Sequence, residues 1–145
     1  MKLREFHIES FLPLRDELRQ WSDRKKMVSV PLFSGYIFVQ VDERERITAL
    51  EMEGALKYVG FGGKLAVVPD ETIESLKIAV VRPRDIRVED SSLKLGQKVL
   101  VRHGPFSGMR GNLVEFRGST RVAIAVDVIH QIVSVEVPLA DLVEA

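Results

Sequence analysis

The chain has 145 residues, 46% of them hydrophobic, with 21 basic and 21 acidic side chains, a formal net charge of zero and no cysteine. This length accommodates one ordinary domain or two small ones, and the lack of cysteine excludes disulfides, thiolate metal sites and a cysteine nucleophile. A balanced charge is not expected of a protein that grips a phosphate backbone over a wide surface, so we expect the main partner to be a protein. No apolar run approaches the ~20 residues of a membrane helix, and no membrane partner is expected.

The N-terminal segment is predicted to form a short strand followed by a polar excursion. Residues 7–13 fit a strand in which Ile8, Phe11 and Leu12 are candidate buried residues. Residues 15–26 are polar and mixed in charge, which is typical of a solvated loop or of the tip of a β-ribbon.

Residues 30–41 form the longest apolar run that fits a single strand, and β-branched and aromatic residues fill it. Alternation along a strand places Tyr36 and Phe38 on one face and the intervening aliphatic residues on the other. Both faces are largely apolar, so both require cover. The aromatic face is therefore either further core or a docking surface, and periodicity alone favours core.

Two helices are predicted downstream of this run. Asp42 is a good N-cap and acidic residues follow it, so a helix is expected over 43–52 with Ile47 and Leu50 facing inward. A second helix, capped by Asp70, is expected to end before Pro83. Its apolar residues form one stripe: Ile73, Leu76 and Val80. Between the helices, residues 55–61 are predicted as a strand and 62–63 as a turn.

The composition changes near residue 93. Residues 83–92 are charged and poor in apolar side chains, which indicates a linker between two domains, 1–82 and 93–145. Beyond it, short Val- and Ile-rich runs separated by Gly and Pro predict about five strands and a small barrel. The runs are 97–103, 111–117, 121–128, 131–137 and a stub near Leu142.

The segment 96–111 carries the pattern of a glycine-rich hairpin. Its characteristic residues are Gly104, Pro105, Phe106, Gly108 and Gly111. Gly104 and Gly108 permit the positive φ that a sharp turn requires. Gly111 would allow the returning strand to approach a neighbour closely.

Residues 32–39, Leu-Phe-Ser-Gly-Tyr-Ile-Phe-Val, resemble the "LFPGYVFV" strand of the NusG family of transcription elongation factors. The resemblance continues in residues 58–63 and 68–70, and the hairpin segment 96–111 resembles the KOW motif of that family. These motifs cover nearly the whole chain in the family's order. The spacing and residues of these motifs are more similar to those of specialised RfaH- and UpxY-like paralogues than to those of housekeeping NusG.

The resemblance implies an α+β fold in two parts. Residues 1–82 would form an NGN domain, a ferredoxin-like βαββαβ antiparallel sheet with helices on one face. Residues 83–92 would be the linker, and residues 93–145 would form a small SH3-like KOW β-barrel.

The first strand of the NGN domain has no counterpart, because the sequence starts near the end of the helix that follows it in the family. Loss of an inner strand would expose sheet edges. Three explanations are open: a fragment or miscalled start, which we favour; a second chain that supplies the pairing in a dimer; or a rearranged fold.

The resemblance also implies function: a cytoplasmic transcription elongation and antitermination factor that is not an enzyme and needs no cofactor. In the family, an apolar pocket of the NGN domain binds the clamp helices of the large subunit of RNA polymerase. The matching residues here are Tyr36, Phe38, Tyr58 and Phe61, with simple core packing as the alternative.

Secondary contacts are implied as well. A weak DNA or RNA contact would use phosphate-binding side chains of the polar excursion, although a solvated loop without a ligand explains them equally well. These side chains are Arg19, Arg24, Lys25 and Lys26. The barrel would bind a termination factor or a ribosomal protein.

Other functions remain as alternatives. The chain could be an RNA- or ribosome-binding KOW protein in which the barrel is the working part, or a structural oligomer. An enzyme is not expected, because the three histidines lack metal-ligand spacing and no nucleophile-elbow or phosphate-binding motif is present.

Overall fold

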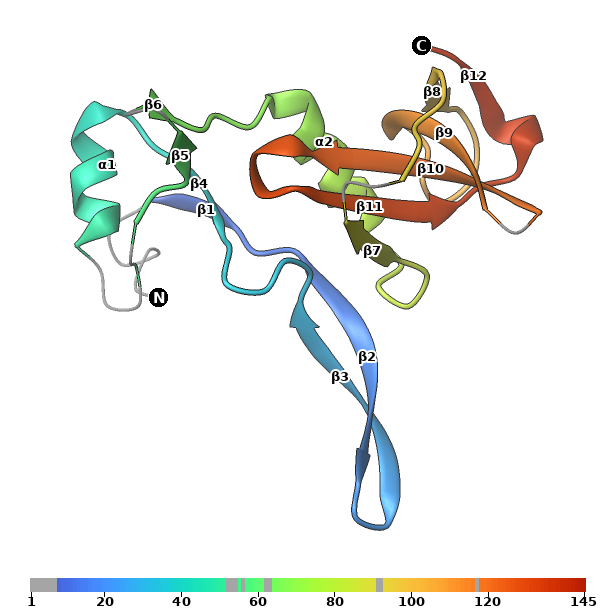
Figure 1. Cartoon of the computed structure of the whole chain (residues 1–145), viewed down its shortest axis with the longest axis horizontal. Coiled ribbons are helices and arrows are strands. Elements are labelled where there is room, and N and C mark those ends of the chain that lie inside the picture. The colour runs from blue at the N-terminus through green and yellow to red at the C-terminus, as the bar shows by residue number, and fades with distance from the viewer. Residues whose placement is uncertain (1–7, 52–54, 56, 62–63, 91–92, 117) are drawn as a thin grey trace.

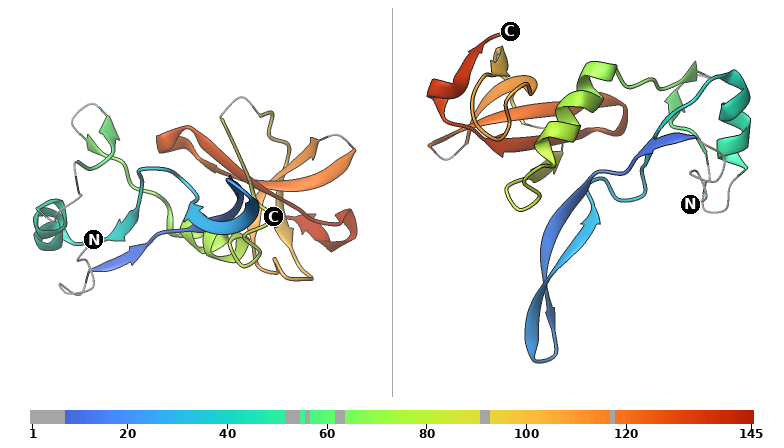
Figure 2. Two further views of the ribbon diagram at one scale, coloured as in Figure 1. Left: turned by 90° about the horizontal axis from the view of Figure 1, so that it is seen from below. Right: turned by 180° about the vertical axis from the view of Figure 1, so that it is seen from behind.

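The computed structural model describes residues 8–51, 55, 57–61, 64–90, 93–116 and 118–145. Figure 1 shows three regions: an N-terminal lobe, a long two-stranded ribbon that projects from the body, and a six-stranded C-terminal sheet. The view from behind in Figure 2 shows the same ribbon standing clear of the other two regions.

The N-terminal lobe contains two pairs of short antiparallel strands. Strand β1 (Glu9–Phe11) pairs with β4 (Phe38–Gln40), and β5 (Gly60–Phe61) pairs with β6 (Lys64–Leu65). The strand predicted over 55–61 is therefore confirmed only at its end, and the turn predicted at 62–63 lies outside the described residues.

Helix α1 (Glu43–Leu50) begins at the predicted N-cap. The Asp42 carboxylate accepts a hydrogen bond from the Glu45 N–H at 2.8 Å, and the Glu45 carboxylate accepts one from the Asp42 N–H at 3.2 Å. This capping box satisfies two backbone donors of the first turn. The predicted inward face is wrong, because Ala49 is buried whereas Ile47 is 59% and Leu50 41% exposed.

The ribbon is formed by β2 (Leu14–Trp21) and β3 (Arg24–Pro31), which pair in antiparallel register along their whole length. A two-residue turn at Ser22 and Asp23 joins them. Of the two interpretations of the polar excursion, the β-ribbon is therefore confirmed.

The predicted strand over 30–41 is wrong as a single element. β3 ends at Pro31, and the chain then turns, with the Tyr36 N–H donating to the Phe33 carbonyl at 3.1 Å. Gly35 adopts a φ of +84°, which glycine tolerates and other residues rarely do. Pro31 cannot donate a ladder hydrogen bond, so proline and glycine together end one strand before β4 begins.

The ferredoxin-like βαββαβ sheet is not found among the described residues. The strands before residue 70 form three separate two-stranded sheets, β1–β4, β2–β3 and β5–β6. The break after Pro31 sends the ribbon away from the lobe, so β2 and β3 do not join β1 and β4. The predicted α+β class is confirmed only in its general composition, which is helices combined with antiparallel strands.

Helix α2 (Asp70–Ala79) packs against the C-terminal sheet, as Figures 1 and 2 both show. Leu76 and Ala79 on its predicted apolar side are fully buried. The predicted cap is wrong, because Pro69 occupies the N-cap position and no side chain caps the helix. Asp70 lies in the first turn instead, where a carboxylate favours the helix dipole.

The C-terminal sheet has the strand order β12-β8-β9-β10-β11-β7. Its strands are β7 (Arg87–Asp90), β8 (Lys98–Val101), β9 (Arg110–Phe116), β10 (Ser119–Val126), β11 (Gln131–Glu136) and β12 (Leu142–Glu144). Short 3₁₀ helices at Asp127–Ile129 and Leu139–Asp141 connect the last three. All the strands predicted after residue 93 are confirmed, because alternating Val and Ile residues separated by Gly and Pro define them locally.

Two features of this sheet differ from the sequence prediction. The outer strands β7 and β12 do not pair with each other, so no closed barrel is found in the described part of the chain. The segment 83–92, predicted as a linker, contains β7, which pairs with β11 from Arg87–Ser134 to Asp90–Gln131. An edge strand can keep charged side chains in solvent, which is why a charged sequence can still form one.

The main hydrophobic core joins the two halves of the chain. It combines Leu76 of α2, Leu32 and Phe33 from the turn after the ribbon, and the inner residues of the sheet. Its members from the C-terminal strands and the turns between them include Val99, Val101, Phe106, Met109, Val122, Ile124, Val126, Ile129, Val133 and Val135. A second, smaller cluster around Ile8 and Ala49 fills the N-terminal lobe.

Candidate functional site

The predicted strand residue Phe38 takes part in a cluster of three aromatic rings. It lies directly opposite Phe11, with the ring centroids 6.0 Å apart and the planes at 26°. Phe33 meets Phe38 edge-on at 6.0 Å and 82°. Such geometry is favourable beyond simple burial. Phe33 is buried, and the other two rings are half-buried against the main core. The main role of Phe38 is therefore to pack against the interior.

Tyr36 is the exposed aromatic residue of the predicted set. It follows Gly35 at the end of the turn, outside β4, and 41% of its surface is accessible. The turn therefore separates Tyr36 from Phe38, which the sequence pattern placed on one face of a continuous strand.

Tyr58 and Phe61 do not join these rings. Tyr58 packs on the smaller cluster with Ile8 and Ala49, and its hydroxyl donates to the Arg46 carbonyl at 2.7 Å. Burial raises the pKa of Tyr58 above its ordinary value, and the nearby Arg46 cation opposes this. Phe61 lies in β5, and the structure describes only its backbone.

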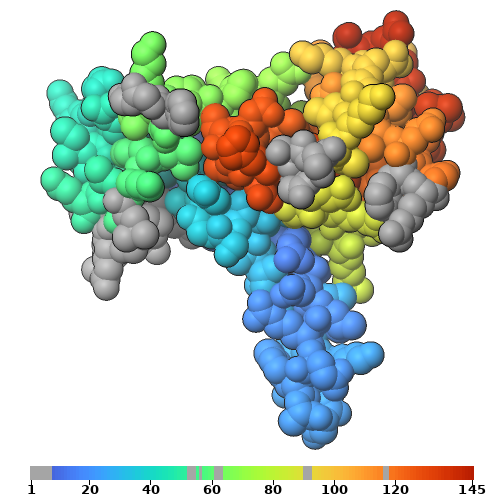
Figure 3. All heavy atoms as spheres, viewed as in Figure 1, coloured from blue at the N-terminus to red at the C-terminus, as the bar shows by residue number. Residues whose placement is uncertain are grey.

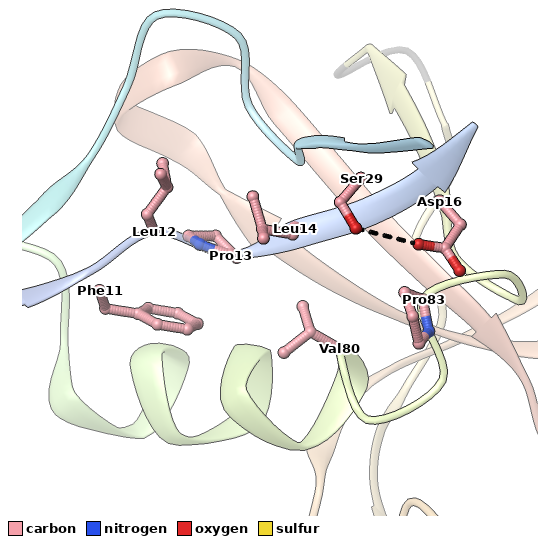
Figure 4. A pocket seen from close by; sticks show the side chains of 8 residues that line it. All are labelled: Phe11, Leu12, Pro13, Leu14, Asp16, Ser29, Val80 and Pro83. Carbon is pink, nitrogen blue, oxygen red and sulfur yellow. Dashed lines mark hydrogen bonds between the residues drawn. The ribbon is translucent and has the colours of Figure 1, made fainter. Parts of the chain in front are cut away.

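An apolar pocket of about 310 Å³ lies at the base of the ribbon (Figure 4). The segment from β1 into β2 forms one side, and the end of α2 with the loop that follows forms the other. Its apolar lining is Phe11, Leu12, Pro13, Leu14, Val80 and Pro83, and Asp16 and Ser29 add polar groups. The Asp16 N–H donates to the Pro83 carbonyl at 3.0 Å, which ties the two sides together.

Sequence reasoning missed this pocket. Leu12 was predicted to be buried, but it is 46% exposed and Leu14 is 40% exposed. The sequence did contain a signal for the pocket. Successive side chains of a strand point to opposite faces, so the continuous apolar run from Phe11 to Leu14 cannot be buried on one face alone. Phe11 connects the pocket to the predicted site, since it lines the pocket and stacks on Phe38.

The four basic residues singled out in the sequence all lie near the free end of the ribbon and are exposed. Figure 3 shows the free end of the ribbon standing clear of the body. Arg19 lies opposite Lys26, and Arg24 lies opposite Trp21, so these residues share one face. Lys25 lies opposite Gln20 on the other face. The structure thus brings three of the four predicted side chains together and separates Lys25 from them.

The predicted hairpin joins β8 to β9. Gly104 and Gly108 adopt φ values of +87° and +94°, as the turn requires. A Cβ on Gly111 would lie 2.4 Å from the Ala123 carbonyl oxygen, so the predicted close approach of strands is confirmed. Pro105 lies on the exposed turn.

The same hairpin is docked against α2. The Arg110 N–H donates to the Ser75 hydroxyl at 3.0 Å, and Ile78 Cδ1 lies 3.5 Å from the position that a Cβ on Gly108 would take. Phe106 and Met109 are buried. The hairpin residues therefore hold the fold together and do not form an open apolar surface.

Neither a metal centre nor a membrane span is seen in the described residues. They contain no cluster of three or more histidine, aspartate or glutamate side chains that could hold a metal ion. Their helices are all too short or too polar to cross a bilayer.

Comparison with known families places the chain in a class of transcription proteins. A family model described as "Transcription termination factor nusG" matches residues 1–77, which is more than half of the 145 residues. The chain belongs to the NusG family.

A particular relative extends this match. The chain is 29% identical, over 122 residues, to the transcription termination/antitermination protein NusG of Thermus thermophilus. The alignment covers 76% of this chain and 66% of that protein. The chain thus spans slightly less than two thirds of the relative's length.

Proposed function

We propose that the protein is a non-enzymatic transcription elongation and antitermination factor of the specialised RfaH/UpxY kind, working in the cytoplasm. Residues 1–82 would carry the NGN function of binding the clamp helices of the large subunit of RNA polymerase. Residues 93–145 would carry the KOW function. The observation that best supports this is the family match combined with an open apolar pocket beside the Phe11–Phe38 stack.

The proposed docking surface consists of Tyr36 and the pocket rim formed by Leu12 and Leu14. All three side chains are at least 40% exposed, which makes them available to a partner. Exposed aromatic and aliphatic anchors beside a pocket suit the apolar face of a helix. Phe38 would act by holding Phe11 in place, because its half-buried ring stacks on Phe11 and packs against the main core. Tyr58 would support the lobe through its packing on Ile8 and Ala49. Phe61 is proposed as a polymerase contact on the family resemblance alone.

Binding of this kind would alter pausing by shifting a conformational equilibrium. A factor that bridges the clamp and the opposite side of the polymerase cleft favours the closed clamp over the open one. Paused states that need an open clamp then lose population, by an amount set by the difference in the factor's affinity for the two states.

Purified bacterial RNA polymerase should bind the intact protein, and Tyr36→Ala should weaken that binding by roughly 30-fold, the loss of about 2 kcal/mol typical of an aromatic hot spot. Leu12→Ser should also weaken it. Affinity is measured by titration calorimetry or by interferometry with immobilised polymerase.

Leu139→Ala is the matched control, because Leu139 is also apolar and 66% exposed but belongs to the C-terminal 3₁₀ helix. Circular dichroism should show all variants folded. Equal affinity of Tyr36→Ala, Leu12→Ser and Leu139→Ala would rule out this surface.

We further propose that Arg19, Arg24 and Lys26 supply the nucleic-acid contact. Their exposure on a projecting ribbon supports this role, although the rest of the chain is balanced in charge. Lys25, which the sequence grouped with them, lies on the opposite face of the ribbon and is left out of this contact. For the C-terminal sheet we propose a termination factor or ribosomal protein as partner. Burial of Phe106 and Met109 directs any such contact away from the hairpin core.

A further inference from the structure

The two faces of the β2–β3 ribbon differ in chemistry. On one face, Leu14 lies opposite Pro31 and Leu18 lies opposite Met27, so apolar pairs recur along that face. The other face is rich in cations and carries an aromatic ring. We name it the basic ribbon face, and its defining residues are Arg15, Arg19, Trp21, Arg24 and Lys26.

Part of the positive charge on the basic ribbon face is left without an acidic partner. Glu17 is the carboxylate on this face, and it is engaged by Arg19 at 2.8 Å and Arg15 at 3.6 Å. Arg24 and Lys26 have no carboxylate within ion-pair distance among the described residues. These two cations are therefore free to meet an external anion.

Trp21 lies beside these cations at the end of the ribbon. It is 44% exposed, and the Lys26 ammonium lies 5.7 Å from the centre of its ring. Trp21 is also directly opposite Arg24 in the register. Exposing an indole on a narrow projection has no benefit for the core, and here the ring lies beside two cationic side chains.

We propose that the basic ribbon face binds single-stranded nucleic acid, with an unpaired base stacked on Trp21 and the adjoining phosphates beside Arg24 and Lys26. Single-strand binding combines a cationic track with exposed rings on which bases stack. A duplex keeps its base faces inside the stack and offers no such face to an indole. This inference deepens the nucleic-acid contact proposed above and rests on that part of the proposed function.

The chain provides its own probe, because Trp21 is the single tryptophan in the sequence. Tryptophan fluorescence of the full chain is titrated with oligothymidylate and with oligouridylate of about 12 nucleotides, within the ~4–16 that one binding module covers. A duplex of equal length is the comparison. We expect saturable quenching by single strands, at least roughly fivefold weaker binding of the duplex, and an affinity that falls as salt rises. The two oligonucleotide arms distinguish DNA from RNA as the source of the strand.

Two adjacent lysines provide a matched pair of variants. Lys26→Ala removes a cation of the basic ribbon face, and Lys25→Ala removes an equal charge one residue away on the opposite face. Lys26→Ala should weaken oligonucleotide binding by about threefold to tenfold, whereas Lys25→Ala should change it by less than about twofold. Trp21→Ala, followed by anisotropy of a labelled strand, should weaken binding by about tenfold, and Trp21→Phe should restore part of it.

Three results would each overturn the inference: no quenching by single strands, equal affinity for the duplex, or equal losses for Lys25→Ala and Lys26→Ala. The polymerase proposal is tested separately. Trp21→Ala and Lys26→Ala should bind polymerase with undiminished affinity in the absence of nucleic acid, and Tyr36→Ala should retain oligonucleotide binding. If Trp21→Ala instead loses polymerase binding while single strands fail to quench the wild type, the ribbon is a protein-docking element and the inference is wrong.

Discussion

The hydroxyl of Ser75 on α2 accepts a hydrogen bond from the backbone N–H of Arg110 at 3.0 Å. Ser75 is 3% exposed, so water does not readily replace it. Through this bond the helix is fixed to the first residue of β9, in the hairpin that the sequence predicted for other reasons.

Ser75→Ala should lower the free energy of unfolding by about 1–3 kcal/mol, because it leaves a poorly accessible backbone N–H without a partner. Urea denaturation followed by circular dichroism measures the change. Ser29→Ala is the control, since the Ser29 hydroxyl makes only an exposed 3.5 Å contact with Asp16. Equal stability of the two variants would mean that the Ser75 bond contributes nothing.

Gly111→Ala should destabilise the protein by about 1–3 kcal/mol or more, because the new methyl group cannot fit without movement of the backbone. Its Cβ would lie 2.4 Å from the Ala123 carbonyl oxygen and 2.9 Å from Val122 Cγ1. The melting temperature should fall accordingly. Glu115→Ala on the same strand, at an exposed position, should leave it nearly unchanged. A Gly111→Ala protein as stable as the wild type would contradict this close approach of strands.

Arg121→Lys should be destabilising although it keeps the charge. The buried Arg121 guanidinium donates from Nε to the Ser134 hydroxyl at 2.9 Å and from Nη2 to the Ser134 carbonyl at 2.8 Å. An ammonium group cannot reproduce this planar fork, so a loss of about 1–3 kcal/mol is expected in denaturant melts. Arg102→Lys at an exposed site should cost almost nothing. Similar midpoints for both variants would refute the role of the fork.

Arg19→Ala should raise the pKa of Glu17. In the wild type the hydrogen bond from Arg19 is the largest influence that lowers this pKa, and the charges of Arg19 and Arg15 act in the same direction. The depressed pKa means that the ion pair is present above the ordinary pKa of glutamate and is lost as the pH falls through the folded-state value. Carbon-detected NMR titration of the Glu17 carboxyl should show its midpoint moving upward in Arg19→Ala and staying in place in Arg102→Ala. An unmoved midpoint in Arg19→Ala would show that this pair does not form in solution.

Local signals in the sequence predicted local structure well. Asp42 with Glu45 fixed the start of α1, and alternating aliphatic residues with Gly104, Gly108 and Gly111 fixed β8 and β9. These features depend on neighbours within a few residues, where propensity and turn chemistry act directly.

Long-range packing could not be predicted in the same way. The apolar stripe of α2 shows that Leu76 is buried but not which sheet buries it. The charges of 87–90 suggested a linker, although an edge strand tolerates them equally well.

For the candidate site, sequence periodicity did not predict how the rings of Tyr36 and Phe38 are arranged. Tyr36 is exposed and Phe38 is half-buried against the main core, because Gly35 ends the alternation that would have aligned the two rings. The pocket beside Phe11 depends on contact between β2 and the loop after α2, whose residues are far apart in sequence. No single-segment pattern contains that information.

The shared core around Leu76 also determines where the chain can be cut. A fragment that starts at residue 93 would lack both α2 and the edge strand β7, leaving one side of the sheet bare and prone to aggregate. A fragment meant to contain the C-terminal half should therefore start upstream of Pro69, so that it includes α2 together with the strands that this helix covers.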